Sequence, residues 1–466
     1  MRRPPSRVKR VLRRGLWLTA CFFAVPSAAW AWSNHTLCTW QAVAVLPQIA
    51  QRTVPAETLA SFLSMEAEHL PQVLEDEERW ARATVPSYAP RPDALAFQAA
   101  RDADATTLRR AFLRAIRANE DMPLNLYLQR PPGTAVPAER MMDWSALSVL
   151  KGMSDLDAHS LERLEDGAAA PVADVIATAS NEPDFGLDIA LWQDNGAPEG
   201  AAYGYGPQPF GNPRLEYSSQ APFHMGFYHE SGILYRAAPY LQNTYPEARI
   251  HLYMTLSRFA FAQGHPYWGW RFAGWAVHYV QDLAQPYHAR VLPGVGVPRM
   301  LWTSVLDMAG VHGPKTAAVN RVTNRHTVLE NYQYHHMAAA YAQGRMDDPL
   351  LAALRDTADD TALPRLLPPS PRDLITVQSA AVADTLDAQL ERSFPAHYVT
   401  DPDTDLDAVP DLDMDAVARQ APEAEQRKLT DLVAARMRQV GRDTRALIRA
   451  VAPTGQEAAA GGDAKP

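Results

Sequence analysis

Residues 278–288 read His278-Tyr-Val-Gln-Asp282-Leu-Ala-Gln-Pro286-Tyr-His288 and close a helical pattern that begins near residue 266. His278 and Asp282 are four residues apart, so a helix places them one above the other on the same face. An imidazole nitrogen and a carboxylate oxygen at that separation are suitable ligands for zinc. Pro286 should kink or end the helix, which lets His288 turn back towards the same point. A lone pair of this kind is more often a buried histidine beside a carboxylate, so a metal site requires further donors.

Such donors occur at intervals along the chain. His326 and Glu330 repeat the four-residue spacing at the start of another helical pattern. Asp184 lies in a turn bounded by proline and glycine, where it could equally serve as a helix cap. The segment 223–229 offers His224 and His229, either of which could be an ordinary surface or capping histidine. Each of these donors is a weak signal alone.

The rest of the chain predicts an all-α architecture, because strand patterns are scarce and apolar residues recur at helical spacing in several segments. Those segments are 55–82, 104–119, 246–263, 266–285, 326–343, 372–393 and 422–451. Trp268, Trp270 and Trp275 are expected to pack in the core rather than form an aromatic cage. Residues 401–415 alternate carboxylates but lack the glycine and glutamate of a calcium loop, which favours a solvated acidic linker. The arginines of 422–451 are expected on a solvated face, and the tail after Pro453 is expected to be frayed.

The first 31 residues have the features of a cleaved secretory signal. They contain seven basic residues and no acidic ones, followed by a short apolar run and by Ala29-Trp-Ala31. Small residues at these two places suit signal peptidase, and the apolar run is too short for a spanning helix. We therefore expect a secreted or periplasmic protein that begins at Trp32. Its freed amine and carbonyl, together with His35, would be additional potential metal ligands.

Charge and cysteine content narrow the function. Loss of residues 1–31 would change the net charge from −9 to about −16, which argues against a stable nucleic-acid partner. Only Cys38 would remain, so the mature chain could form no internal disulfide. Rigidity must then come from core packing and from metal.

In order and spacing, these donors resemble the zinc-dependent phospholipase C family, whose relatives include single-strand-specific nucleases. The pattern HYxxDxxQPxH at 278–288 is complete, and His326 begins the pattern HxxxEN. The resemblance implies a multi-helix domain that holds three zinc ions. One would be bound by Asp184, His224, His278 and Asp282, and a second by His288, His326 and Glu330. The third would be bound by Trp32, His35 and the shared Asp282. His224 is preferred to His229 because its context is closer to that of the family.

The resemblance covers about residues 32–345 and implies a phosphodiester hydrolase. Neighbouring divalent metals neutralise phosphoryl oxygens and activate a water molecule, and Asp184 would also orient that water as the catalytic residue. Phe185 could offer a ring face to a choline-type cation, although it could equally be a wall residue. Residues 289–325 suit either a lid or lipid-contacting hairpin or an ordinary packed helix. Residues 346–466 are expected to form a helical C-terminal extension with the acidic linker and a disordered tail.

Three functions remain open at this point. The first is a phospholipase C that releases a phosphorylated headgroup from phospholipid, with transient contact to a membrane surface. The second is a single-strand nuclease or nucleotidase that uses the same three zinc ions. The third is a non-catalytic helical protein with structural metal, which is disfavoured because structural zinc sites are usually closed sets of four ligands.

Overall fold

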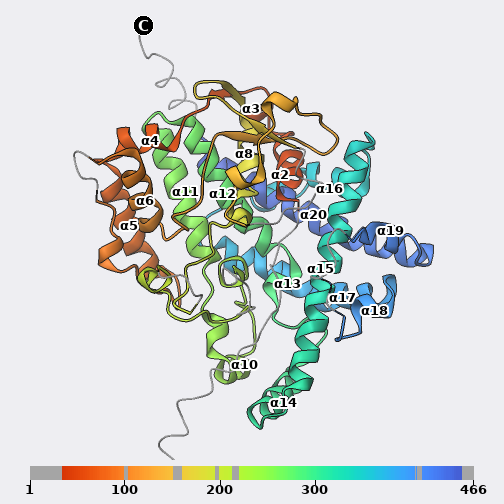
Figure 1. Cartoon of the computed structure of the whole chain (residues 1–466). Helices are drawn as coiled ribbons and strands as arrows, with labels where there is room; N and C mark the ends of the chain where they lie inside the picture. Colours follow the sequence, from red (N-terminus) through yellow and green to blue (C-terminus); the bar gives the residue numbers. More distant parts are fainter. Residues whose placement is uncertain are drawn as a thin grey trace, which may run out of the picture.

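The computed structural model describes residues 34–98, 103–150, 160–194, 199–211, 220–404, 406 and 412–453. The predicted signal peptide, the terminal ligand Trp32 and the tail after residue 453 lie outside these ranges, as does part of the acidic linker. The described chain is predominantly helical, as the sequence predicted (Figure 1). None of its helices combines the length and the apolar character that crossing a membrane requires.

The main helices follow one another along the whole chain. Their bounds are α2 His35–Val43, α3 Pro47–Ala50, α4 Leu59–Glu66, α5 Leu70–Thr84, α6 Ala105–Ala115, α8 Val172–Ala179, α9 Ala221–His224, α10 Gly232–Ala237, α11 Pro246–Ala262, α12 Pro266–Leu283, α13 Pro286–Ala289, α14 Val297–Met308, α15 Gly313–Ala342, α16 Pro349–Arg355, α17 Thr376–Ser393, α18 Ala396–Val399, α19 Met414–Ala418 and α20 Glu423–Val451. The described residues also form short 3₁₀ and π-helical turns and two antiparallel pairs of short strands, β1 (Thr53–Pro55) with β4 (Ala169–Pro171) and β2 (Tyr127–Gln129) with β3 (Leu161–Arg163).

Helix α12 is the centre of the core. Every residue of α12 from Tyr267 to Leu283 is buried, including the three tryptophans, which confirms their predicted packing role. Helices α8, α11 and α20 pack against it. Proline begins both α11 and α12, where the missing N–H costs no helical hydrogen bond. Helix α12 ends at Leu283 and α13 begins at Pro286, so the helix is interrupted just before the proline, as predicted.

A close crossing of α8 and α12 determines where the candidate metal ligands lie. A Cβ on Gly274 would lie 2.5 Å from the Cβ of Ala179 and 2.6 Å from the carbonyl oxygen of Ile176. Only glycine permits this approach, because the backbone of α8 cannot yield as a flexible side chain would. The crossing places the chain that follows α8 directly beside the last two turns of α12.

Several predicted boundaries differ from the structure. The segment 55–82 is divided into α4 and α5, and the proline near the start of α5 fits its first turn. Helix α15 begins at Gly313, well before His326, because the preceding polar residues hid the pattern. Residues 289–325 contain α14, which is a packed helix on one face and exposed on the other.

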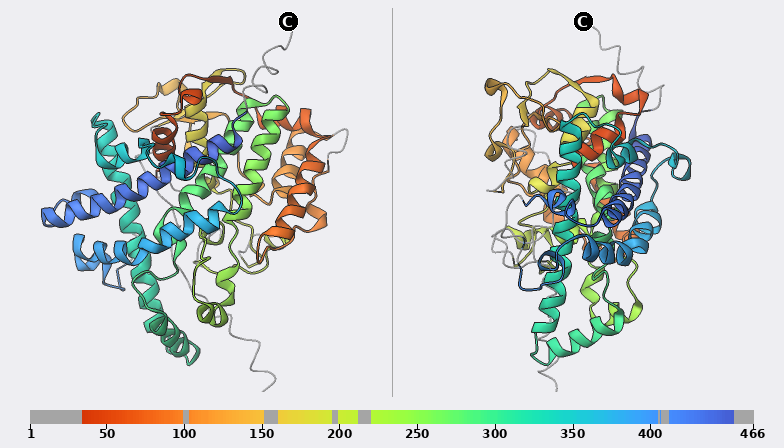
Figure 2. Two further views of the ribbon diagram at one scale, coloured as in Figure 1. Left: turned by 180° about the vertical axis from the view of Figure 1, so that it is seen from behind. Right: turned by 90° about the vertical axis from the view of Figure 1, so that its right-hand side faces the viewer.

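The C-terminal part contributes helices to the same core. Helix α20 packs against α2, α12, α16 and α17, and Figure 2 shows it extending across the molecule on the side opposite to the view of Figure 1. The predicted solvated arginine face was wrong for the end of this helix. The Arg445 side chain is buried, pairs with Asp360 and donates to the carbonyls of Leu354 and Asp356, while Arg449 also pairs with Asp360. The arginines at the end of α20, which the sequence predicted to be solvated, therefore hold this helix against the segment that follows α16.

Candidate metal centre

Helix α12 supplies the first two candidate ligands. His278 and Asp282 are both fully buried, and Nε2 of His278 lies 3.3 Å from Oδ2 of Asp282. The four-residue spacing therefore produces the predicted juxtaposition. A buried carboxylate is unfavourable unless positive charge or hydrogen-bond donors surround it, so further groups must meet it here.

The turn after α8 brings Asp184 to this pair. Asp184 belongs to the 3₁₀ helix η4 (Glu182–Phe185), and its Oδ1 lies 3.7 Å from Nε2 of His278. The neighbouring Glu182 holds η4 on α12, because it pairs with Arg271 at 2.6 Å and accepts a hydrogen bond from Trp275. The Pro-Asp turn is thus fixed by a buried ion pair on the same helix that carries His278.

The structure distinguishes the two histidines that the sequence left as alternatives. The side chain of His224, at the end of α9, is fully buried, and its Nδ1 lies 2.8 Å from Oδ2 of Asp282 and 3.0 Å from Nε2 of His278. His229 lies elsewhere, where its Nε2 is 2.9 Å from the hydroxyl of Thr376. The structure therefore brings His224, and not His229, to the cluster.

His35 approaches the cluster from the start of α2. Its Nε2 lies 3.4 Å from Oδ1 of Asp282 and 3.8 Å from Oδ2 of Asp184. The two oxygens of Asp282 therefore face different histidines, since Oδ1 faces His35 and Oδ2 faces His224 and His278. This division suits a carboxylate that bridges two cations. The Asn34 side chain caps the helix that carries His35 by accepting a hydrogen bond from the backbone N–H of Leu37.

A second group forms beside the first. Nε2 of His288, on α13, lies 3.2 Å from Nε2 of His326, and Nε2 of His326 lies 2.6 Å from Oε1 of Glu330. Both α15 residues are buried and are one helical turn apart, as predicted. Eight of the nine predicted ligands therefore lie in two neighbouring groups, and the ninth, Trp32, is outside the described residues.

The donor set fits a divalent cation of the zinc type. The sets His35–Asp184–His278, His224–His278–Asp282 and His288–His326–Glu330 each offer ligand atoms that lie within 4.8 Å of one another. Imidazole nitrogens and carboxylate oxygens are ligands that zinc prefers. Moreover, Nε2 of His35 and all four carboxylate oxygens of Asp184 and Asp282 are buried without a hydrogen-bond partner in the described structure. Such atoms are costly unless something else binds them, and a cation would satisfy them together.

Three of the imidazoles donate a hydrogen bond to an acceptor on the side away from the cluster. Nδ1 of His278 donates to the carbonyl oxygen of Ser180 at 2.9 Å, and Nδ1 of His288 donates to that of His224 at 3.0 Å. Nδ1 of His35 donates to Oε1 of Gln281 at 2.8 Å. Metal-binding histidines usually have an acceptor of this kind, which fixes the ring and frees the other nitrogen for the metal. Sequence reasoning did not identify Gln281, although it lies next to Asp282.

A carboxylate, Asp188, lies behind a fourth imidazole, that of His224. Its Oδ2 lies 3.3 Å from Nε2 of His224. Arg249 pairs with its other oxygen at 2.5 Å, and the Tyr279 hydroxyl donates to Oδ2 at 2.5 Å. No local sequence pattern predicted that Asp188 would lie behind His224, because the residues that hold it come from different helices, Arg249 from α11 and Tyr279 from α12.

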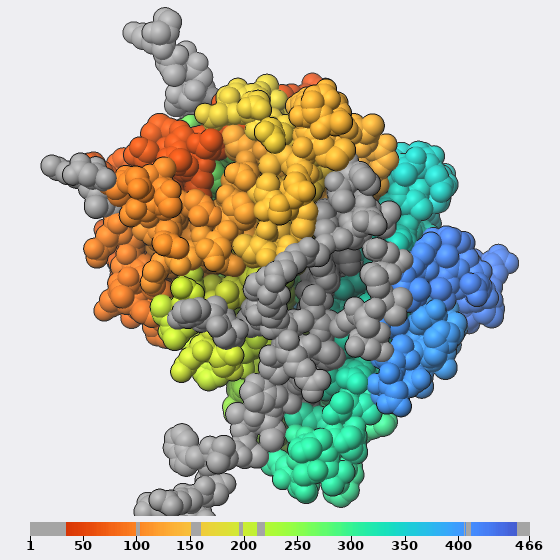
Figure 3. Space-filling model, in the orientation of Figure 1, coloured from red at the N-terminus to blue at the C-terminus, as the bar shows by residue number. Residues whose placement is uncertain are grey.

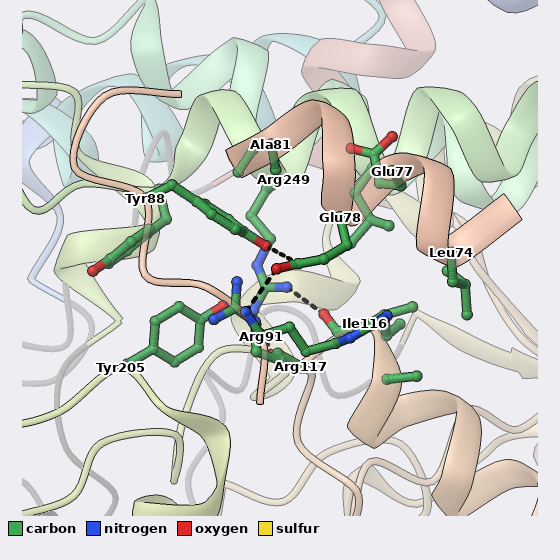
Figure 4. Close-up of a pocket in the computed structure, with 14 residues that line it drawn as sticks. Leu74, Glu77, Glu78, Ala81, Tyr88, Arg91, Ile116, Arg117, Tyr205 and Arg249 are labelled. Atoms are coloured by element: carbon green, nitrogen blue, oxygen red, sulfur yellow. Dashed lines mark hydrogen bonds between the residues drawn. The ribbon is translucent and has the colours of Figure 1, made fainter. Parts of the chain in front are cut away.

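Arg249 also lines a hollow that is separate from the metal-ligand groups. Figure 4 shows its guanidinium donating to the Ile116 carbonyl, a bond of 2.8 Å, among the charged side chains of Glu78 and Arg91. Glu78 is already engaged by the Tyr88 hydroxyl and by the backbone N–H of Arg91. This hollow contains none of the predicted ligands. Its connection to the candidate metal centre is Arg249, which pairs with Asp188.

Burial and mutual charge shift the pKa values within the cluster. Burial raises the pKa of Asp184 to about 7, against the influence of the neighbouring histidines. Burial lowers the pKa of His288 to about 3 and also lowers the pKa of His278. For His224 burial acts downward as well, but the nearby carboxylates of Asp188 and Asp282 outweigh it and raise the pKa to about 10. A cation bound by this cluster would therefore compete with a proton for Nδ1 of His224.

Phe185, the predicted substrate contact, is buried beside Asp184. Its ring packs edge-on against Trp144 with centroids 4.6 Å apart, and its carbonyl accepts a hydrogen bond from the Ser148 hydroxyl. These contacts make it part of the wall on this side of η4. Its role towards a substrate stays a prediction.

Comparisons of the chain with models of protein families, with curated proteins and with solved structures give no match. The geometry of the buried donors is therefore what bears on function.

Proposed function

We propose that this protein is an exported, zinc-dependent phosphodiester hydrolase of the phospholipase C type, which releases a phosphorylated headgroup from phospholipid. The observation that carries the proposal is the convergence of eight buried donors from α2, η4, α9, α12, α13 and α15. A structural zinc site needs only four ligands, so a set this large supports a multinuclear hydrolytic centre. The sequence pattern at 278–288 supports the same family.

Zinc bound by these residues would supply a Lewis acid for the phosphoryl oxygens and lower the pKa of a water molecule. The number of ions in the proposal is three, as the phospholipase C pattern implies. The residues that would hold them are Trp32, His35, Asp184, His224, His278, Asp282, His288, His326 and Glu330.

Asp184 is the residue to which we assign the catalytic role. Its oxygens lie 3.7 to 3.9 Å from the nearest imidazole nitrogens, whereas those of Asp282 lie 2.8 to 3.4 Å from theirs. Histidine nitrogens therefore lie close to both oxygens of Asp282, whereas the oxygens of Asp184 are farther from any imidazole and more accessible to a proton. In the proposed reaction Asp184 orients the attacking water and accepts its proton at a carboxylate oxygen.

The test compares lipid with nucleic acid as substrate. Zinc-loaded mature protein should release phosphorylated headgroup from phosphatidylcholine or phosphatidylethanolamine vesicles and should leave single-stranded DNA intact. Cleavage of the DNA without headgroup release would instead favour the nuclease. If chelation of the metal left both activities unchanged, both metal-dependent hydrolases would be eliminated.

A matched pair of histidine variants links the activity to the cluster. His224→Gln should lower turnover by at least about a hundredfold, because it removes a direct ligand and disturbs its neighbours. His229→Gln, five positions further along the same segment, should retain activity. Equal activity of the two variants would contradict the assignment.

A further inference from the structure

Exposed apolar side chains gather at one end of the molecule. Five of the ten large apolar side chains exposed among the described residues lie on α10 and on the hairpin of α14 and α15, and we name these five the apolar tip: Ile233, Trp302, Val305, Met308 and Val311. Their exposed fractions range from 49% to 62%. Monomeric soluble proteins rarely cluster such residues unless the surface binds something.

The tip is one face of α14, next to α10. Trp302, Val305 and Met308 recur every three residues and so lie along one side of the helix. Met300 and Thr303 are buried on the opposite side, and α14 contacts α10, which carries Ile233. The exposed apolar face is therefore additional to the packed face that holds α14 in place.

The two described segments that carry the tip have no exposed carboxylate. In segments 230–237 and 297–317 the acidic residues are Glu230 and Asp307, and both are buried. Glu230 pairs with Arg290 at 3.2 Å, and Asp307 pairs with Lys315 at 2.8 Å. In contrast, Arg236 and Arg299 are exposed on the same segments. A chain of net charge −9 thus presents exposed cations and no exposed carboxylate on these two segments.

The tip projects from the body and is connected to the metal-binding groups. Figures 1 and 2 show α14 at the far end of α15, away from the main helical layers, and Figure 3 shows it as a protrusion at the lower edge. At 1.5 Å per residue, Gly313 at the start of α15 lies about 20 Å along the helix from His326. Between them a hollow borders His326, lined by apolar side chains that include Leu292, Val319 and Val322.

We propose that the apolar tip docks the protein on the surface of a phospholipid bilayer. A tryptophan on a projecting apolar face suits the boundary between headgroups and acyl chains, and flanking arginines suit lipid phosphates. A projecting tip offers little area for a stable dimer, which needs about 800 Å² per partner. The inference rests on the proposed function, because a phospholipase C must meet a phospholipid surface to reach its substrate.

The experiment measures partition separately from chemistry. Zinc-loaded protein is sedimented briefly in the cold with vesicles of equimolar phosphatidylcholine and phosphatidylglycerol. Trp302→Ser/Met308→Ser should partition at least about tenfold less than the wild type, since it removes two large apolar contacts. Leu367→Ser/Val377→Ser removes two exposed apolar residues elsewhere, 59% and 43% exposed, and should partition as the wild type does.

A soluble phosphodiester, bis(p-nitrophenyl) phosphate, separates the two proposals. The tip variant should hydrolyse it at the wild-type rate while losing activity on vesicles. Equal partition of tip variant and wild type, or no partition of either, would overturn the docking surface while soluble turnover still supported the hydrolase. Absence of turnover by the wild type on any phosphodiester would overturn the hydrolase whatever the partition. If the wild type bound no vesicles but self-associated, and the tip variant did not self-associate, the membrane-docking proposal would be wrong and the tip would instead bind a second copy of the chain.

Discussion

Oδ2 of Asp188 lies 3.3 Å from Nε2 of His224, on the opposite side of the imidazole from Asp282. Arg249 and Tyr279 hold this carboxylate from α11 and α12. With Asp188 on its Nε2 side, His224 turns Nδ1 towards the other candidate ligands. Asp188 is therefore a positioning residue for the cluster.

Asp188→Asn should weaken zinc binding by about 10- to 100-fold, because the amide cannot hold the imidazole as the carboxylate does. Competition with a chromogenic chelator measures the affinity directly. Asp194→Asn, on an exposed residue that accepts a hydrogen bond from the backbone of Gln208, provides the control. Unchanged affinity in Asp188→Asn would show that His224 needs no such orientation.

The crossing of α8 and α12 can be tested with two helical glycines. Gly274→Ala should destabilise the fold by about 1–3 kcal/mol, because the new methyl group would collide with Ala179 and with the backbone of Ile176. Gly313→Ala meets no atom within 4 Å and should be neutral or slightly stabilising. Urea unfolding measures both. Similar stabilities of the two variants would mean that the helices separate at little cost.

The buried pair of Glu182 and Arg271 holds η4 on α12. Glu182→Leu should cost about 3–5 kcal/mol, because it leaves the Arg271 guanidinium buried without its counter-charge. Glu423→Leu removes the exposed partner of Arg427 on α20 and should change stability by at most about 0.5 kcal/mol. Equal losses in urea unfolding would show that burial of the first pair adds nothing.

His336 gives the fold a defined pH dependence. It lies between Asp348, 3.0 Å away, and Asp415, 2.9 Å away, and so links α15 to the starts of α16 and α19. Burial lowers its pKa, but the hydrogen bonds to the two aspartates outweigh this and raise it to about 9. Because the folded value exceeds the unfolded one near 6.5, the stabilisation is complete below pH 6.5 and is lost as pH rises through 9.

The stability difference between the wild type and His336→Gln should therefore shrink between pH 6.5 and about 9, by at most about 1.4 kcal/mol per pH unit. Urea unfolding across this range measures it. A difference that stayed constant with pH would indicate that the histidine acts by packing alone.

Sequence reasoning succeeded where the relevant geometry is local. The pairs His278–Asp282 and His326–Glu330 follow from helical spacing, and the break before Pro286 follows from the chemistry of proline. Spacing alone did not separate His224 from His229, and only the family context favoured His224, because the outcome depends on which of them the fold brings to Asp282. It also misread Arg445, since the burial of an arginine depends on a distant partner, here Asp360.

The hydrogen-bond acceptors that orient the candidate ligands could not be predicted from the sequence, for the same reason. Ser180 contributes only a backbone carbonyl, and the partners of Gln281 come from two other helices, α2 and α20. Hydrogen-bond partners distant in sequence leave no spacing to detect. The resemblance in order and type of the donors indicated the candidate ligands, but not the groups that orient them.

Gln281 links the two ends of the described chain. Its oxygen accepts from His35, while its amide donates to Thr39 at 2.8 Å and to Thr444 at 3.1 Å. The imidazole nearest the start of the polypeptide thus takes its orientation from a network that is completed only by the last helix. During synthesis that network stays unfinished until almost the whole polypeptide has emerged, so premature termination before α20 would leave the His35 side chain without its full hydrogen-bond support.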